Sequence, residues 1–491
     1  MKKFKRFTSM MLALLLVFSS IAAFVACNEK DDESDSTVDT AESKVEITTE
    51  AEKDIHPTIK KKNYNDEFYL HILPDVNPVD CYWVEESSNE MLTEAVYARQ
   101  RMVYDYLGVE VQGIKTGNYS QYIEPFKTAV KNKDGSVDTL ISHVHTGIDG
   151  LIGENYLMDL NLVPGVELDS EHWNAEFMEN ISINDHMFLG YNNLNILYTY
   201  VVTYNKDMMD KYDDSFDETI YEMVDNYHWT LDKMISISNL AYIDITNDGK
   251  TLDDQFGISG LHWVPFCGFL HSSNINLVEM NEEGGYSVVV YNDLNQSKTS
   301  SLISILKDFA ASNSAWFWPN GSDQKVLFTG GKSLMALSPS TSLPSYTNYE
   351  LSFGVLPYPM FDEAQANVGY RSLQWGGYVC VPSYVEDLNM VGETIELLAY
   401  FSDNVREVYY EKLLGKQVAD SPDDRRMLDL IWSSICSDFG QTYYSVVQKT
   451  SLLYMVPKLT LPTATQSIAS FMASVDKSAD KLFKAYLSKI K

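Results

Sequence analysis

The sequence predicts an α/β fold, with helices packed on the faces of a parallel sheet. Between residues 67 and 144, three short apolar runs of strand character alternate with two segments of helical periodicity. A helix between two strands carries the chain back to the edge where the first strand began, so consecutive strands run parallel. The chain has 491 residues, which is enough for two domains of about 150 to 200 residues or for one large domain.

The predicted elements of the first part follow one another closely. The segment EFYLHIL at residues 67–73 is short, apolar and aromatic, as expected of a strand. Residues 90–107 have helical spacing, residues 108–114 form a second strand, and YSQYIEPFKTAV forms another helix before a Lys-Asp-Gly turn. Residues 137–144 give the third strand. The glycine-rich stretch after residue 142 is predicted to form loops at the carboxyl ends of strands, where open α/β sheets bind ligands.

The later part of the chain is richer in helical patterns. Residues 392–414 and 425–436 are amphipathic, and residues 464–491 end in a lysine-rich helix. The sequence shows no internal repeat.

The N-terminal residues have the pattern of an export signal. Residues 1–6 carry three lysines and one arginine, and residues 10–26 are apolar except for two serines. The stretch Phe24-Val25-Ala26-Cys27 resembles the lipobox of bacterial lipoproteins, in which small residues precede a cysteine that is acylated and becomes the new N-terminus. We therefore expect residues 1–26 to be a lipoprotein signal peptide and Cys27 to carry an acyl chain such as palmitate. The alternative is an uncleaved membrane anchor, because residues 7–26 are just long enough to span a bilayer.

An acidic segment follows Cys27. Residues 28–54 contain eleven acidic residues and three lysines, with serine and threonine between them. Such a composition buries too little apolar surface to offset the entropy of ordering, so residues 27–60 are predicted to form a disordered tether. The tether would hold a folded domain clear of the membrane at the extracellular face of the cell.

Charge and cysteine content exclude several classes of function. The net charge of −32 makes electrostatic binding to nucleic acid or to an anionic membrane surface unfavourable. The cysteines besides Cys27 are Cys81, Cys267, Cys380 and Cys436, with no CxxC pair and no zinc-type spacing. We expect buried free thiols rather than a disulfide framework, and a single long-range disulfide is the remaining alternative.

Four segments in the middle of the chain carry a resemblance to a known family. They are TYVVTYNKDMMDKY at residues 199–212, HWTLDKM at 228–234, VLFTGGKSLMAL at 326–337 and FGVLPYPMFDEAQ at 353–365. In this order they resemble the extracellular solute-binding proteins of ABC importers, family 1, the maltose-binding type. In that family a strand ends in Tyr-Asn-Lys-Asp before a helix, as at residues 204–207 here. A second helix opens with a Thr-Trp-Asp-Glu-Leu-like N-cap, whereas here Trp229 precedes Thr230. Thr230 is itself a good N-cap residue.

The resemblance implies a two-lobed, periplasmic-binding-protein-like (type II) fold, with central sheets flanked by helices and a ligand cleft between the lobes. It implies a first lobe of residues 61–200 and 354–415 and a second lobe of residues 201–353 and 416–491. It also implies a monomeric, lipid-anchored extracellular protein that captures a small solute, most often a sugar or oligosaccharide, and delivers it to ABC permease subunits. No cofactor and no catalysed reaction are implied.

Two other functions stay open at the level of the sequence. An exported glycan-processing enzyme needs a pair of carboxylates, which 69 acidic residues easily supply. A structural or adhesive surface lipoprotein would use aromatic side chains to bind wall glycans without a permease.

Residues at predicted strand ends are candidates for ligand contact, because these ends face the cleft in open α/β sheets. A sugar site combines aromatic rings, which contact C–H faces, with polar side chains that bind hydroxyl groups. The candidates are Tyr82, Trp83 and Glu85 after the first strand, His143 and His145 after the third, Asn193 before the first crossing, Trp263, Trp316, Trp318 and Trp375, and Arg371 as a selector of carboxylated sugars.

Several candidates also have a purely structural interpretation. Tyr82 and Trp83 can belong to a loop packed on the sheet, and Arg371 can form a surface ion pair. Asn193 lies in an asparagine-rich turn, which needs no ligand. Trp316 and Trp318 share one side of an extended segment and form either a stacking platform or the edge of the core.

Two metal-binding patterns are incomplete. His143 and His145 share one face of a strand, but no nearby cysteine or further histidine completes a set. The stretch from Asp244 to Gly249 begins like a calcium-binding loop, but Gln255 stands where a bidentate glutamate belongs. We therefore expect no bound metal.

Overall fold

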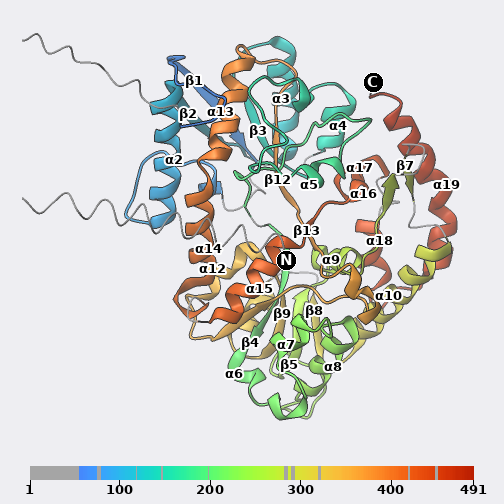
Figure 1. Ribbon diagram of the computed structural model, residues 1–491. Helices are drawn as coiled ribbons and strands as arrows, with labels where there is room; N and C mark the ends of the chain where they lie inside the picture. The colour runs from blue at the N-terminus through green and yellow to red at the C-terminus, as the bar shows by residue number, and fades with distance from the viewer. Residues whose placement is uncertain are drawn as a thin grey trace, which may run out of the picture. The chain divides into compact units, whose positions relative to one another are not determined.

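Two main sheets organise the residues that the structure describes (Figure 1). The computed structural model describes residues 55–73, 79–117, 119–144, 147–196, 198–280, 286–288, 293–318, 322–418, 421–447 and 452–490. These residues belong to one compact unit that spans Asp54–Lys491. The predicted signal peptide, Cys27, most of the predicted tether and His145 lie outside the described residues.

The first sheet has four strands in the order β12-β3-β1-β2. Strand β1 (Asp66–Ile72) runs parallel to β2 (Val109–Lys115) on one side and to β3 (Thr139–His143) on the other. Helix α2 (Met91–Leu107) joins β1 to β2, and α3 (Tyr119–Asn132) joins β2 to β3. The three predicted strands, the two predicted helices and the parallel order are therefore confirmed.

Burial explains why these residues form the centre of the first sheet. Phe68, Leu70 and Ile72 share one face of β1 and are fully buried. On the other face His71 is buried and Tyr69 half-buried, so both faces of this strand are covered. Helix α2 ends at Gly108, which adopts φ +65° and leads directly into β2. A Cβ atom at Gly108 would lie 1.8 Å from Oδ1 of Asn63, so only glycine fits this tight turn.

The second sheet has five strands in the order β10-β4-β9-β5-β8. These are β4 (Tyr200–Asn205), β5 (Phe256–Leu261), β8 (Ala315–Trp318), β9 (Ser333–Pro339) and β10 (Phe353–Leu356). Strand β5 runs parallel to β8 and β9, whereas β4 runs antiparallel to β9 and β10. The carboxyl ends of β5, β8 and β9 consequently share the edge at which β4 begins.

The Tyr-Asn-Lys-Asp motif ends β4 and starts a helix, as the resemblance implies. The side chain of Asn205 caps α6 (Lys206–Met209) by accepting a hydrogen bond from the N–H of Met208 at 3.0 Å. Lys206 pairs with Asp424, a fully buried carboxylate that also accepts a hydrogen bond from the hydroxyl of Tyr221 at 2.6 Å. The motif thus anchors the end of β4 to α15 (Pro422–Ser433).

The second motif also starts a helix. The Thr230 hydroxyl accepts a hydrogen bond from the N–H of Lys233 at 3.4 Å and caps α8 (Leu231–Ala241). Trp229 is buried, and its indole N–H donates to the carbonyl of Pro357 at 2.9 Å. The tryptophan that precedes the cap therefore packs α8 against the segment that follows β10.

The fourth segment that carries the resemblance, residues 353–365, does not cross directly to the first sheet. Residues 353–356 form β10, which pairs with β4 at the edge of the second sheet. The chain returns only after Leu373, and β12 (Gly376–Cys380) then pairs antiparallel with β3 in the first sheet. Backbone pairing with β4 holds β10 in the second sheet, so the division of the chain at residue 354 does not follow the sheets.

The C-terminal helices contact both halves of the unit rather than the second alone. Helix α17 (Tyr444–Val447) contacts α4 (Ile148–Gly153), whereas α18 (Leu452–Leu459) contacts α9 (Val264–Ser272). Near the end of α19 (Ile468–Leu487), the Tyr486 hydroxyl donates to the carbonyl of Asp149 at 2.9 Å. The assignment of residues 416–491 to the second half is therefore only partly correct.

The predicted long helices differ from the structure in detail. Residues 392–414 form two helices, α13 (Leu388–Tyr400) and α14 (Asp403–Val418), and the glycine-rich stretch contains the short helix α4. The remaining elements are η1 (Val79–Cys81), η3 (Leu160–Leu162), α5 (Ala175–Glu179), η4 (Asp213–Ser215), α7 (Ile220–Asp225), β6 (Val278–Met280), β7 (Tyr286–Val288), α10 (Asp293–Ala311), α11 (Ser322–Thr329), η5 (Ser340–Ser342), α12 (Leu343–Tyr346), η6 (Glu363–Asn367), β11 (Ser372–Leu373), β13 (Ile435–Cys436) and α16 (Phe439–Thr442).

The four described cysteines are free thiols, as expected. Cys81, Cys267 and Cys380 are buried, and Cys436 is half-buried. Among the described residues, none of the helices combines the length and the apolar character needed to cross a membrane.

Candidate functional site

The region where the chain passes between the two sheets is the candidate site. Short strands β11 and β13 pair in parallel there. Beside them, the N–H of Trp375 donates to the carbonyl of Tyr198 at 3.0 Å, just before β4 begins. Segments far apart in the sequence therefore lie side by side at this crossing region.

The side chain of Gln374 ties the crossing segments together. Its Oε1 accepts a hydrogen bond from the N–H of Tyr198 at 3.1 Å. Its Nε2 donates to the carbonyls of Ile196 at 3.0 Å and Gly376 at 2.8 Å. Its own N–H donates to the carbonyl of Cys436 at 3.2 Å. With only 1% of its surface exposed, this amide fixes the geometry of the crossing region.

An aromatic cluster lies at the carboxyl end of β3. The ring of His143 is 5.5 Å from the ring of Tyr198, centroid to centroid, and Gly376 lies opposite His143 in the strand register. A Cβ atom at Gly376 would lie 2.6 Å from Cδ2 of His143 and 3.4 Å from the Tyr198 ring. Glycine at this position is therefore what lets the two rings pack. Tyr198 is only half-buried, so part of this cluster reaches the surface.

Further rings lie at the facing edge of the second sheet. Tyr200, the first residue of β4, meets the buried Trp375 edge to face at 6.0 Å. Trp263 follows the carboxyl end of β5, precedes α9 and has 40% of its surface exposed. Leu261 at the end of β5 pairs with Trp318 at the end of β8. Aromatic residues thus occupy the carboxyl ends of strands from both sheets.

Two titratable groups of this region, Tyr200 and His262, are uncharged near neutral pH. Burial raises the pKa of Tyr200 above its ordinary value, so its hydroxyl keeps its proton. Burial also lowers the pKa of His262 to about 4, and its Nε2 lies 2.9 Å from the hydroxyl of Thr460. A region with these uncharged groups and aromatic rings suits a neutral ligand with apolar faces.

A pocket of about 470 Å³ lies on the other side of β11 and β13, next to Arg371. It is lined by Glu179, Asn180, Asn276, Val278, Glu279, Tyr286, Arg371, Ser437, Asp438 and Phe439. The Arg371 guanidinium donates to Oδ1 of Asn274 at 2.5 Å and to Oδ1 of Asn276 at 3.0 Å. Burial raises the pKa of Asp438 to about 6, against the opposing effect of two backbone N–H donors.

The sequence over residues 103–404 matches the family of bacterial extracellular solute-binding proteins. The chain belongs to this family. No curated protein sequence matches the chain. Since the family consists of binding proteins, the aromatic crossing region is the natural place to look for a bound solute.

Solved structures of sugar-binding proteins share the fold of this solute-binding protein. The GacH receptor of Streptomyces glaucescens, solved unliganded and with acarbose, aligns with a TM-score of 0.56 at 14% identity and covers 86% of this chain and 99% of its own. The galacto-N-biose-/lacto-N-biose I-binding protein from Bifidobacterium longum gives 0.55 at 14% identity, covering 86% and 97%. MalE from Listeria monocytogenes, solved with maltose, gives 0.53 at 13% identity, covering 87% and 99%. The fold is therefore the two-lobed α/β fold of periplasmic binding proteins.

The solute-binding protein brings some predicted site residues together and separates others. His143 and Trp375 meet at the crossing region, and Trp263 lies at the facing edge of the second sheet. Tyr82 is completely buried, which removes it from any solute-contacting surface. Trp83 packs over Gly113, and its indole N–H donates to the carbonyl of Val111 at 2.9 Å. These two rings therefore pack on the first sheet, which was the structural interpretation of their loop.

Other predicted residues lie away from the aromatic cluster. Glu85 is exposed in the loop after η1. Asn193 accepts a hydrogen bond from Arg406 at 2.6 Å and donates to Asp403 at 3.1 Å, which ties its turn to α14. Trp316 packs 5.2 Å from Phe256, the first residue of β5, and thus lies toward the amino ends of the strands. The side chain of Trp318 lies outside the described part of the structure.

Tyr198 and Gln374 lie in the crossing region and were not among the residues predicted from the sequence. Tyr198 lies six residues before the Tyr-Asn-Lys-Asp motif, so its position directly before a crossing strand was a usable signal. Gln374 holds the crossing segments together mainly through hydrogen bonds to residues distant in the sequence, and a local sequence pattern cannot predict such contacts.

Proposed function

We propose that this solute-binding protein captures a carbohydrate between its two lobes and delivers it to the permease of an ABC importer. The family match over residues 103–404 carries this proposal. Three proteins of the same fold are named for, or were solved with, sugars or acarbose, which favours a carbohydrate ligand. The neutral aromatic surroundings of the crossing region are chemically suited to the C–H faces of a sugar.

The solute is held, in this proposal, by the half-buried Tyr198 on the first side and Trp263 on the second, and the buried His143 supports the Tyr198 ring. The buried Trp375 supports the site by packing edge to face against Tyr200. The first lobe consists of the sheet β12-β3-β1-β2 with its helices, and the second consists of the sheet β10-β4-β9-β5-β8 with its helices. Closure of the lobes around the sugar would be favoured by the difference between its affinities for the closed and open forms.

The protein works, in this proposal, as a monomer anchored to the outer face of the membrane through acylated Cys27. The signal pattern of residues 1–26 and the acidic segment after Cys27 support this arrangement. The mass of the mature wild-type protein should correspond to a chain that begins at an acylated Cys27, and substitution Cys27→Ala should abolish incorporation of labelled palmitate. A mature wild-type chain that keeps residues 1–26 and takes up no palmitate would point to an uncleaved anchor instead.

A binding function without catalysis distinguishes this proposal from an exported glycan-processing enzyme. A panel of mono- and oligosaccharides, uronic acids, peptides and polyamines is added to the purified mature chain, and the melting temperature is measured. We expect at least one sugar to raise it, and mass spectrometry after prolonged incubation to recover that sugar intact. Cleavage of the sugar would identify an enzyme. Stabilisation by a peptide or a polyamine alone would overturn the carbohydrate assignment.

A further inference from the structure

Three side chains with metal-binding groups converge outside the proposed solute site. His56 precedes β1, Glu167 lies in the loop after η3, and Glu396 lies on α13. One ligand atom from each of the three lies within 4.8 Å of the others. Residues far apart in the sequence therefore bring one imidazole and two carboxylates to a single point.

Burial makes this cluster unusual. Glu396 has 0% and His56 has 1% of its surface exposed. A buried carboxylate is costly unless hydrogen bonds or a positive charge compensate for its lost hydration. Burial accordingly raises the pKa of Glu396 and lowers that of His56.

The two oxygens of Glu396 are not equally satisfied. Oε2 accepts hydrogen bonds from the indole N–H of Trp173 at 2.7 Å and from the N–H of Glu167 at 3.0 Å. Oε1 has only longer contacts, to the hydroxyl of Ser170 at 3.5 Å and to Nε2 of His56 at 3.9 Å. The under-satisfied oxygen therefore faces the imidazole, with space between them for a cation.

Thr58 supplies a second layer of contacts around the cluster. Its hydroxyl donates to the carboxylate of Glu167 and lies 3.3 Å from Nδ1 of His56. Nδ1 also accepts the N–H of Ile59 at 3.2 Å and that of Thr58 at 3.3 Å, so the proton of the neutral ring resides on Nε2. Binding of a metal at Nε2 would move this proton to Nδ1, where the Thr58 hydroxyl is its acceptor. The same step would break the hydrogen bonds that Nδ1 accepts from the N–H groups of Thr58 and Ile59.

A second histidine lies beside the cluster. The rings of His56 and His172 both contact Tyr400 edge-on, with centroid distances of 4.8 Å and 4.9 Å. Nδ1 of His172 is buried and makes no hydrogen bond within the described part of the chain. The ring nitrogens of His172 are not among the mutually close ligand atoms, so His172 borders the cluster rather than belonging to it.

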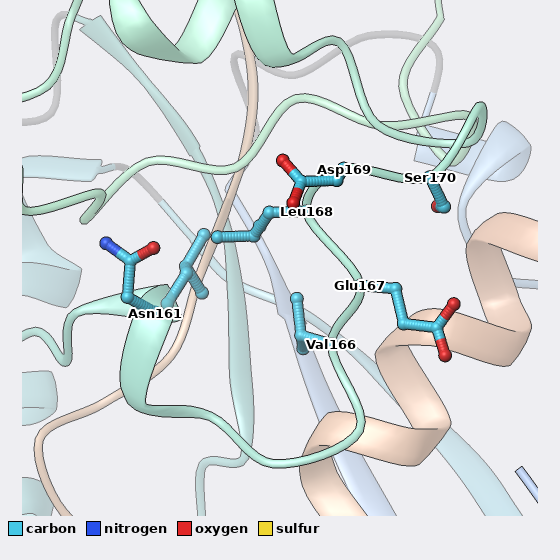
Figure 2. Close-up of a pocket in the computed structure, with 7 residues that line it drawn as sticks. Asn161, Val166, Glu167, Leu168, Asp169 and Ser170 are labelled. Atoms are coloured by element: carbon cyan, nitrogen blue, oxygen red, sulfur yellow. The ribbon is translucent and has the colours of Figure 1, made fainter. Parts of the chain in front are cut away.

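A surface pocket of about 500 Å³ lies beside the cluster and shares Glu167 with it (Figure 2). The pocket is lined by Leu160, Asn161, Val166, Glu167, Leu168, Asp169 and Ser170. Figure 2 shows the Glu167 side chain pointing away from Asn161, toward the helix drawn in tan. Glu167 thus lines the pocket and also belongs to the cluster.

We propose that His56, Glu167 and Glu396 bind one divalent transition-metal ion, with Zn²⁺ as the best match. Imidazole nitrogen and carboxylate oxygen are both ordinary ligands of Zn²⁺, and a doubly charged ion compensates for two carboxylates. The ion would clamp the segment before β1 onto α13 and onto the loop after η3. Its role is structural and is independent of the proposed solute.

The experiment is a Zn²⁺ titration of the purified mature chain, prepared without a histidine tag and stripped with EDTA, by calorimetry. We expect one ion per chain, a melting temperature that rises with Zn²⁺ and falls again with EDTA, and tighter binding at pH 7.5 than at pH 5.5, where the histidine is more often protonated. Co²⁺ in place of Zn²⁺ should give the absorption bands of a protein-bound ion.

Two variants and one matched control test the assignment. Glu396→Gln keeps the shape of the side chain, and His56→Ala removes the imidazole, so each should weaken Zn²⁺ binding at least about tenfold. His228→Ala is the control, because His228 lies 2.7 Å from a carboxylate oxygen of Glu218 but outside the three-residue cluster. The proposal fails if the wild-type chain takes up no Zn²⁺, or if His56→Ala and Glu396→Gln bind it as tightly as His228→Ala does. Melting temperatures in EDTA separate loss of metal from loss of folding.

Discussion

Trp263 presents an exposed ring at the edge of the second sheet, directly before α9. We expect Trp263→Ala to weaken binding of the sugar found in the melting screen about tenfold, or ~1.4 kcal/mol, because a stacking face is lost. Calorimetric titration measures the change. Since the ring is partly exposed, the melting temperature of the free protein should barely move.

Trp83→Phe is the matched control for that substitution. Trp83 donates to the carbonyl of Val111 and packs over Gly113, so its loss should lower stability and leave sugar affinity unchanged. Unchanged affinity in Trp263→Ala would exclude its ring from the proposed site.

Gly376 is required by the packing of His143 against Tyr198. A Cβ atom at this position would lie 2.6 Å from the His143 ring, so Gly376→Ala should displace that ring and destabilise the fold by about 1–3 kcal/mol. Urea denaturation measures the loss. Gly150→Ala is the control, because a Cβ atom there meets nothing within 4 Å. Equal stability of the two variants would contradict the packing argument.

At the scale of elements, Asp438 links β13 to the hairpin of β6 and β7. It accepts hydrogen bonds from the N–H of Gln441 at 2.6 Å and from that of Leu277 at 3.1 Å. Because its folded-state pKa of about 6 lies above its ordinary value of 3.8, the folded state binds the proton more tightly than the unfolded state does. Asp438 therefore lowers the free energy of unfolding as pH rises from 4 to 7, by roughly 1–3 kcal/mol.

The measurement is the difference in free energy of unfolding between the wild type and Asp438→Asn, followed from pH 4 to pH 7. Asparagine cannot ionise, so we expect the variant to gain stability relative to the wild type as pH rises. Asparagine can accept only one of the two backbone hydrogen bonds. This loss lowers the stability of the variant equally at every pH, so the dependence of the stability difference on pH is unchanged. The exposed Asp253→Asn substitution should show no such slope, and a flat difference for Asp438→Asn would contradict the buried-charge explanation.

Most elements were predictable because their patterns are local. Strands β1, β2 and β3 are short apolar runs separated by helical spacing, and these patterns decide their conformation before any tertiary contact forms. The break between α13 and α14 was missed because the amphipathic pattern continues across it. There the Ser402 hydroxyl donates to the carbonyl of Leu398 at 2.6 Å and accepts a hydrogen bond from buried Arg99 at 2.9 Å.

The site was less predictable than the elements. His143, Trp263 and Trp375 could be proposed from the sequence because they stand at or near strand ends, which sequence patterns locate. Tyr82 and Trp83 follow a strand in the same way, yet they pack on the sheet, because the direction of a loop depends on tertiary contacts. The place of β10 was missed for a similar reason. Pairing with β4, rather than the sequence of β10 itself, decides to which sheet this strand belongs.

At the scale of the whole molecule, a solute held between the lobes should stabilise both of them together. A ligand at one hundred times its Kd adds about 2.7 kcal/mol to the free energy of unfolding. We expect scanning calorimetry of the mature chain to show a single transition that moves upward with sugar. Movement of only one of two separate transitions would place the ligand within one lobe.

The order of strands along the chain has a consequence for how the molecule assembles. Every strand of the second sheet comes from the continuous stretch of residues 200–356, whereas the first sheet waits for β12, which is made long after β3. Pairing of distant segments is slow because a long loop must close first, so the second sheet should mature earlier. Pulse-labelled hydrogen exchange during refolding should therefore protect amides of β4, β5 and β9 before those of β12. In a nascent chain the first sheet therefore lacks its edge strand until β12 has been made, which happens after every strand of the second sheet is complete.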